Sequence, residues 1–111
     1  MPDTMADRRN ATRYPMILIA EIRDLQGENK LSARTSDLSR TGCYIDTLNP
    51  LPKGSSVRIK LLRDDKTFEA VGKVMYVSPG LGMGIQFDEP LPPKQVVLLE
   101  NWLQHGAKQP D

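Results

Sequence analysis

The chain has 111 residues, of which 39% are hydrophobic and 26% charged, so it has material for one modest core and we expect a single domain. Its lone cysteine, Cys43, and lone histidine, His105, exclude a disulfide framework, a cysteine-based metal cluster and a histidine-rich metal site. The formal net charge of +1 argues against a general polyanion binder, although six of the eight arginines lie in the first forty residues.

Glycine and proline divide the chain into short apolar runs about ten residues apart, a spacing typical of an all-β barrel or sandwich. Residues 1–14 carry almost no core material, and we predict a flexible N-terminal arm there. The expected strands are 16–23, 31–36, 42–48, 57–61, 67–77 and 82–87. Val57, Ile59 and Leu61 alternate with basic residues, which makes 57–61 the clearest strand. Gly72 is a candidate for a bulge or bend in the long fifth strand.

A helical period replaces the strand pattern from Pro93 to His105. An apolar stripe is formed by Val96, Leu98, Leu99, Trp102 and Leu103, whereas Val97 falls on the polar side. We therefore predict an all-β fold with one C-terminal helix docked on a six-stranded antiparallel barrel, comprising residues 15–106, and a disordered tail at 107–111.

The N-terminal segment lacks the apolar stretch of an export signal, and the longest apolar run, Met16–Ala20, is too short to span a bilayer. We expect a cytoplasmic protein with no membrane partner. No base–nucleophile pair or set of metal ligands can be assembled from the motifs, so we do not expect an enzyme, a metal or a cofactor.

Two local patterns carry the functional prediction. The first is Arg9-Asn10-Ala11-Thr12-Arg13, preceded by Arg8, and the second is Asp37-Leu38-Ser39-Arg40-Thr41-Gly42 between two strands. Taken separately, the first is consistent with a solvated tail and the second with an ordinary turn stabilised by Asp and Ser side chains. Together, R-x-x-x-R and D-x-S-x-x-G in an all-β chain resemble the PilZ family.

The resemblance extends from about Arg8 to Leu103 and implies a six-stranded PilZ barrel whose two motifs bind the bacterial second messenger cyclic di-GMP. It implies that Arg9 and Arg13 match guanine or phosphate acceptors and that Asp37 accepts guanine N–H groups or holds an arginine. It also implies that Ser39 bonds a guanine amine or a phosphate oxygen, while Gly42 permits a turn or a close backbone approach.

In the family, an extra arginine before the first motif is associated with a stacked dimer of the nucleotide, so Arg8 predicts two ligands per chain. Tyr76 is the candidate for a residue that stacks on guanine, with a simple barrel tyrosine as the equal alternative. The implied protein is a stand-alone, monomeric receptor that signals in trans to an unidentified downstream protein governing motility, biofilm formation or polysaccharide secretion.

Two alternatives remain open from the sequence. A single-stranded nucleic-acid binder of the small-barrel type would use the arginines, but only two Phe, one Trp and three Tyr are available for stacking, and we expect no nucleic-acid partner. The other alternative is a protein-interaction module that has the same fold but does not bind cyclic di-GMP.

Overall fold

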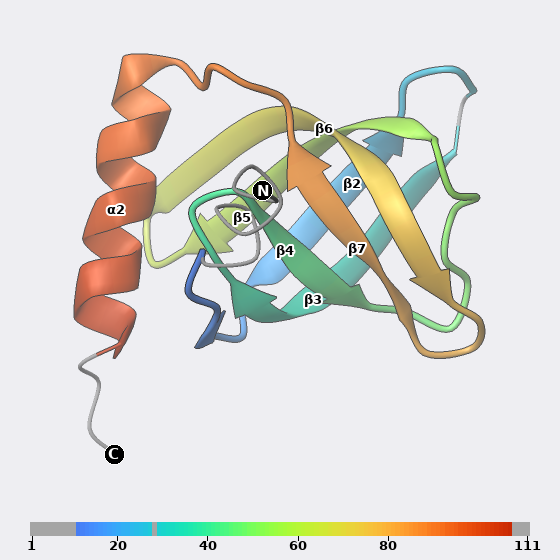
Figure 1. The fold of residues 1–111 in the computed structure, drawn as a ribbon, viewed down its shortest axis with the longest axis horizontal. Coiled ribbons are helices and arrows are strands. Elements are labelled where there is room, and N and C mark those ends of the chain that lie inside the picture. Colours follow the sequence, from blue (N-terminus) through green and yellow to red (C-terminus); the bar gives the residue numbers. More distant parts are fainter. Residues whose placement is uncertain (1–10, 28, 108–111) are drawn as a thin grey trace, which may run out of the picture.

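The protein folds as a closed antiparallel barrel with one helix against it (Figure 1). The structure, a computed structural model, describes residues 11–27 and 29–107. The strands are β1 (Tyr14–Pro15), β2 (Ile19–Asp24), β3 (Lys30–Leu38), β4 (Gly42–Asp46), β5 (Ser56–Arg63), β6 (Lys66–Ser78) and β7 (Gly82–Phe87), and the helix is α2 (Pro93–Ala107). Strands pair in the order β3-β2-β5-β6-β7-β4, and β4 returns to β3, so six strands close the barrel while the short β1 pairs with β3. The predicted six-stranded antiparallel barrel with a C-terminal helix is confirmed.

Strict alternation along the strands builds the core. Val57, Ile59 and Leu61 of β5 are fully buried, as their period of two predicts, while Arg58 and Lys60 between them are exposed. Phe68 and Phe87 pack in the same interior, with ring centroids 5.1 Å apart. Because closure pairs the six barrel strands on both sides, it also protects their backbone edges from pairing with other chains.

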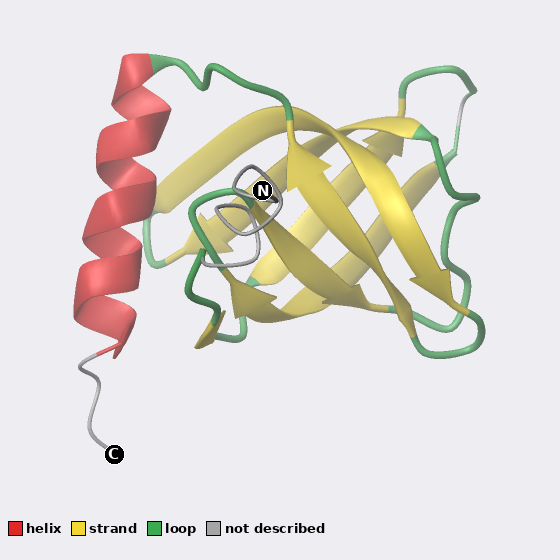
Figure 2. Ribbon diagram, in the orientation of Figure 1, coloured by secondary structure: helices red, strands yellow, loops and turns green. Residues whose placement is uncertain are grey.

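Helix α2 closes one end of the barrel from outside, as Figure 2 shows. Its buried side chains are Leu99, Trp102 and Leu103, while Val97 is 68% exposed, which confirms the predicted stripe and its misfit. The Trp102 ring lies 6.5 Å from that of Phe68. The Gln95 side-chain oxygen also accepts a hydrogen bond from the backbone N–H of Glu69 at 2.9 Å, which ties the helix to β6.

The predicted strand ends differ from the observed ones near β1 and β3. The first long strand begins at Ile19, not Met16, because Thr35 bonds this segment through its side chain: its Oγ1 accepts from the Leu18 N–H and donates to the Met16 carbonyl. Strand β3 continues to Leu38, so Asp37 belongs to a strand and not to a polar link, and β4 ends at Asp46 instead of residue 48. Tyr14, the last residue of the predicted arm, is paired with β3 and packs against the core.

The bulge predicted at Gly72 is wrong. Gly72 stays in register with both neighbouring strands, and a Cβ there would collide with the backbone carbonyl of Gln86, so the residue serves the close approach of β6 and β7. The register shifts lie elsewhere, between Val74 and Tyr76 in β6 and between Thr35 and Asp37 in β3.

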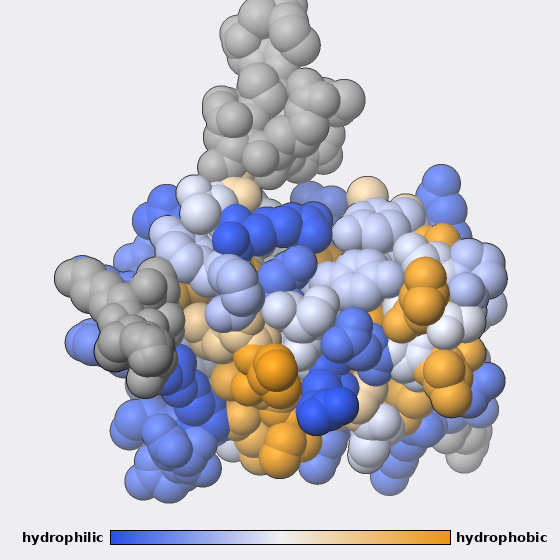
Figure 3. Space-filling model, turned by 90° about the horizontal axis from the view of Figure 1, so that it is seen from below, coloured by the Kyte–Doolittle hydropathy of each residue, from blue (hydrophilic) through white to orange (hydrophobic). Residues whose placement is uncertain are grey.

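The surface seen in Figure 3 is mostly hydrophilic and carries small separate apolar patches. Of the helices in the part of the chain that the structure describes, none has the length and apolarity needed to cross a bilayer.

Candidate functional site

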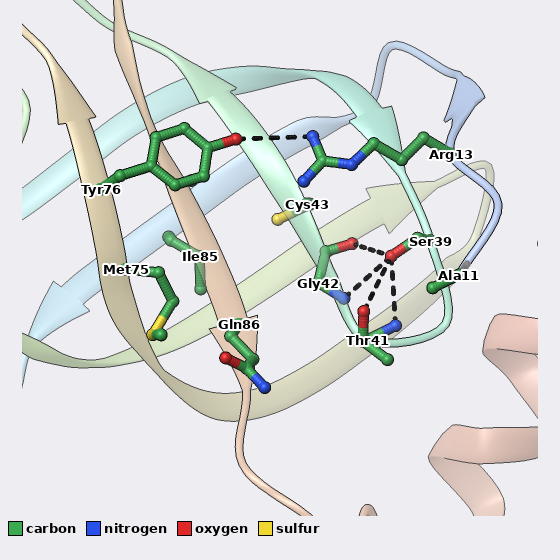
Figure 4. A pocket seen from close by; sticks show the side chains of 11 residues that line it. Ala11, Arg13, Ser39, Thr41, Gly42, Cys43, Met75, Tyr76, Ile85 and Gln86 are labelled. Atoms are coloured by element: carbon green, nitrogen blue, oxygen red, sulfur yellow. Dashed lines mark hydrogen bonds between the residues drawn. The ribbon is translucent and has the colours of Figure 1, made fainter. Parts of the chain in front are cut away.

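A pocket of about 620 Å³ opens where four segments meet on the outside of the barrel (Figure 4). The segment before β1 contributes Ala11 and Arg13, and β6 and β7 supply one wall. The β3–β4 hairpin contributes Ser39, Thr41, Gly42 and Cys43. The wall consists of Met75, Tyr76, Gly84, Ile85 and Gln86. The two sequence motifs therefore meet at one cavity, together with strands that neither motif contains.

Arg13 places its guanidinium over this pocket. Its Nη1 lies 3.4 Å from the hydroxyl of Tyr76 and 3.6 Å from Oδ2 of Asp37, and the side chain is 55% exposed. The hydrogen bond to Tyr76 and the charge of Asp37 raise the pKa of Arg13, so the group is cationic at every physiological pH. Both contacts are long and solvent-exposed, so an incoming anion or guanine edge can replace them at little cost.

Asp37 lies outside the core and beside Arg13 because of the first bulge. Inward-facing residues of β3 alternate up to the buried Thr35, and unbroken alternation would turn Asp37 into the core. The shift between Thr35 and Asp37 instead buries Leu38 and leaves Asp37 outside, where Oδ2 faces Arg13. Its Oδ1 is buried and has no hydrogen-bond partner among the described residues. A ligand donor can reach this oxygen only if the carboxylate turns, whereas Oδ2 already faces Arg13.

Tyr76 reaches the same pocket through the second bulge. Along β6, Phe68, Ala70 and Val74 are buried and lie an even number of residues apart. Continued alternation would therefore bury Tyr76 as well. After the register shift, Met75 and Tyr76 are both exposed, at 42% and 41%. The Tyr76 ring lies over Gly84 of β7, where any Cβ would collide with it.

The Tyr76 ring is braced by a second tyrosine. Tyr44 of β4 stacks beside it, with ring centroids 6.1 Å apart and planes inclined by 29°. The phenol face toward the pocket is therefore held in place as an aromatic platform.

Ser39 and Gly42 build the hairpin that carries the second motif. The Ser39 Oγ accepts hydrogen bonds from the N–H groups of Thr41 and Gly42, each at 3.2 Å, and the Ser39 N–H donates to the Gly42 carbonyl at 2.8 Å. Gly42 packs so tightly on β7 that a Cβ would overlap the Ile85 carbonyl oxygen. These two motif residues line the pocket, but the hydrogen bonds and packing contacts described above mainly stabilise the loop.

The hairpin also contacts the helix. Arg40, at the tip between Ser39 and Gly42, forms a 2.8 Å ion pair with Glu100 of α2, and both side chains are largely exposed. Arg40 is absent from the pocket lining, so its charge is directed to the helix and not to the cavity.

The structure thus brings together Arg13, Asp37, Ser39, Gly42 and Tyr76, five of the seven predicted site residues. Arg8 and Arg9 lie outside the described residues. Sequence reasoning missed Tyr44, Met75 and Gln86 as neighbours of the site. The one available signal was the alternate glycines Gly82 and Gly84, which leave room on the outer face of β7 for aromatic rings from adjacent strands.

Cys43 lies beneath the pocket and is buried. Burial raises the pKa of its thiol, and the nearby Asp37 charge raises it further, so the neutral thiol persists through the pH range where a free cysteine ionises. Because only the thiolate is nucleophilic, we expect the folded protein to resist alkylation by iodoacetamide, with no acceleration as pH rises toward the ordinary thiol pKa. Mass spectrometry of the native protein and of a guanidinium-unfolded control measures this; fast labelling of the native sample contradicts it.

The sequence matches the PilZ domain family over residues 7–105, and the chain is a member of that family. The family resemblance inferred from the two motifs is therefore confirmed. No match to a curated protein reaches significance.

Solved structures support the same fold. The PilZ domain of YcgR from Escherichia coli with c-di-GMP has a TM-score of 0.76 and 17% identity, covering 92% of this chain and 93% of that one. The PilZ domain of CeSA from a cellulose-synthesizing bacterium has a TM-score of 0.67 and 21% identity, covering 86% and 100%. The Bacillus subtilis inhibitor of motility MotI (DgrA) has a TM-score of 0.72 and 16% identity over 94% of this chain and 54% of its own. At these identities the likeness establishes the fold alone.

Proposed function

We propose that this chain is a non-enzymatic receptor that binds cyclic di-GMP through its R-x-x-x-R and D-x-S-x-x-G motifs. The observation that carries the proposal is that, in a PilZ family member, the Arg13 guanidinium and the braced Tyr76 ring line one pocket with Ser39 and Gly42, and that Asp37 lies beside Arg13. The YcgR domain, whose fold is similar, was solved with c-di-GMP.

Each of these groups suits one part of that ligand. Guanine offers O6 and N7 as paired acceptors that an arginine fork matches, and each good pair contributes about 1–3 kcal/mol of discrimination. The guanine N–H donors suit the Asp37 carboxylate, and stacking of a base on an aromatic ring such as Tyr76 contributes about 1–3 kcal/mol. The second arginine of the motif, Arg9, supplies a further fork for a phosphate or for the other guanine.

The output of the receptor is a changed surface for a partner protein in trans. In this mechanism, the bound nucleotide holds the segment that carries the first motif against the 37–42 segment, which Arg13 and Tyr14 already contact. The Arg40–Glu100 ion pair connects the same hairpin to α2, so a shift of the loop reaches the exposed face of the helix. The downstream partner acts in motility, biofilm formation or polysaccharide secretion.

Isothermal titration calorimetry with cyclic di-GMP tests binding and stoichiometry together. We expect saturation at two nucleotides per chain for the wild type, as a stacked dimer, and at one for Arg8→Ala. Saturation at one nucleotide in both proteins would remove Arg8 and the dimer from the proposal, while a flat wild-type titration would remove the receptor function itself.

A further inference from the structure

A row of three basic side chains crosses the outer face of β3, β2 and β5. Arg23 of β2 lies directly opposite Lys30 of β3 on one side and Arg58 of β5 on the other. All three are exposed. With strands spaced about 4.8 Å apart, the row spans roughly 10 Å, and like charges facing each other across strands destabilise a sheet.

The row is not neutralised within the described part of the chain. None of its three cations forms an ion pair with a described carboxylate, and Glu21, two residues before Arg23 on the same side of β2, sits opposite Lys60. Lys60 in turn faces Glu69 on β6, so the two rows together hold four cations and two carboxylates and the face keeps a net positive charge. A hollow of about 420 Å³ lies over these strands, and its lining includes all three members of the row, Lys60 and Glu21.

Toward the other end of β2 the same face carries exposed apolar side chains beside Arg34. Ile19, four residues before Arg23 on the same side of the strand, is 58% exposed, and the preceding Ile17 is 71% exposed. The distance from Ile19 to Arg23 is about 14 Å along the strand. Exposed isoleucines beside arginines suit a partner that carries both carboxylates and apolar side chains, whereas a nucleic-acid backbone would gain nothing from the isoleucines.

The location separates this face from the nucleotide pocket. In Figure 1, β2 and β5 form the far wall of the barrel, behind β4 and β7, whereas the pocket opens between β4, β6 and β7. A macromolecule on the far wall therefore leaves the pocket free.

From the unneutralised row and the adjoining isoleucines, we infer that the outer face of β3, β2 and β5 binds an acidic segment of a partner protein, with carboxylates on Lys30, Arg23 and Arg58 and an apolar side chain on Ile19. The chemistry is charge complementarity at one end and burial of apolar surface at the other. This inference does not require that the pocket bind cyclic di-GMP.

Amide chemical-shift mapping of the full chain tests the inference. The probe is a synthetic peptide with a short block of glutamates followed by a pair of leucines, and its control has glutamines in place of the glutamates. We expect the acidic peptide to shift amides of β2, β3 and β5 in a salt-dependent manner, and the control peptide to leave them unchanged. Shifts located elsewhere, or equal shifts from both peptides, overturn the inference, as does binding of oligothymidylate or phosphatidylglycerol vesicles to this face in place of the acidic peptide.

Paired variants make the test specific. We expect Arg23→Gln/Arg58→Gln to weaken the peptide by at least about tenfold, and Lys53→Gln/Lys94→Gln, which removes two exposed cations elsewhere, to leave its affinity unchanged. Equal losses in both variants would reduce the effect to net charge and overturn the site. Cyclic di-GMP affinity stays at the wild-type value in both, so failure here and failure of the proposed function are read separately.

Arg58→Gln is also expected to raise the melting temperature at low salt and not at high salt; a lowered value contradicts the unneutralised row.

Discussion

Replacing Gly42 by alanine is expected to lower the free energy of unfolding by roughly 2–4 kcal/mol. A Cβ at this position would overlap the carbonyl oxygen of Ile85 on β7, which is backbone and cannot rotate away. The β4–β7 pairing would have to open, including the hydrogen bond that the Phe87 N–H donates to the Thr41 carbonyl at 2.8 Å. Urea denaturation followed by circular dichroism measures the change.

Gly27→Ala is the matched control. Its Cβ would meet side-chain atoms only, the nearest being an exposed carboxylate oxygen of Asp24 at 3.2 Å, so we expect a change within about 0.5 kcal/mol. Equal stabilities for the two variants would contradict the packing argument. If Gly42→Ala does not fold at all, circular dichroism in the absence of denaturant shows it directly and agrees with the stated direction.

This expectation changes how the second motif is interpreted. The resemblance assigned Ser39 a bond to the ligand and Gly42 a turn or a close backbone approach. The structure shows Ser39 Oγ holding two loop N–H groups and Gly42 allowing β4 to approach β7. A loss of binding in Gly42→Ala would therefore reflect a damaged barrel. Asp37 is the motif position whose bonding capacity is left open, because its Oδ1 has no described partner.

Most of the fold could be predicted from local pattern. The period of two in β5 and the 3.6-residue stripe of α2 can be seen in the sequence and predict which side chains are buried. Burial of Leu61 and Trp102 confirms both. The strand ends near Met16 could not be predicted in this way, because they depend on a side-chain bond from Thr35, which is nineteen residues away. Register and closure likewise depend on contacts between distant strands, which a local pattern does not encode.

Only part of the candidate site could be predicted from the sequence, for the same reason. Motif spacing indicated Arg13 and Asp37, but the two bulges that turn Asp37 and Tyr76 outward carry no local signal. We predicted a bulge or bend at Gly72 because glycine accepts unusual backbone angles. The register shift between β6 and β7 instead lies beyond Val74. Tyr44, which braces Tyr76, belongs to no motif and becomes a neighbour only when β4 and β6 meet across β7.

Arg9→Ala/Arg13→Ala is expected to weaken cyclic di-GMP binding by at least about thirtyfold, since each arginine fork on guanine contributes about 1–3 kcal/mol and tenfold in affinity corresponds to about 1.4 kcal/mol. Stability should barely change, because the contacts of Arg13 with Tyr76 and Asp37 are long and exposed, and such pairs contribute about 0–1 kcal/mol. Calorimetry measures the affinity, and a thermal melt verifies the fold.

Arg40→Ala provides the control that separates a specific fork from general positive charge. Arg40 lies in the same hairpin as the second motif, but its guanidinium is paired with Glu100 at 2.8 Å and does not line the pocket. Its removal eliminates one unit of charge close to the site, so we expect an affinity change of no more than about threefold, from weakened long-range attraction alone. If Arg40→Ala loses as much affinity as the double variant, binding depends on local charge and not on the R-x-x-x-R geometry. If the double variant keeps wild-type affinity, the site assignment itself is wrong.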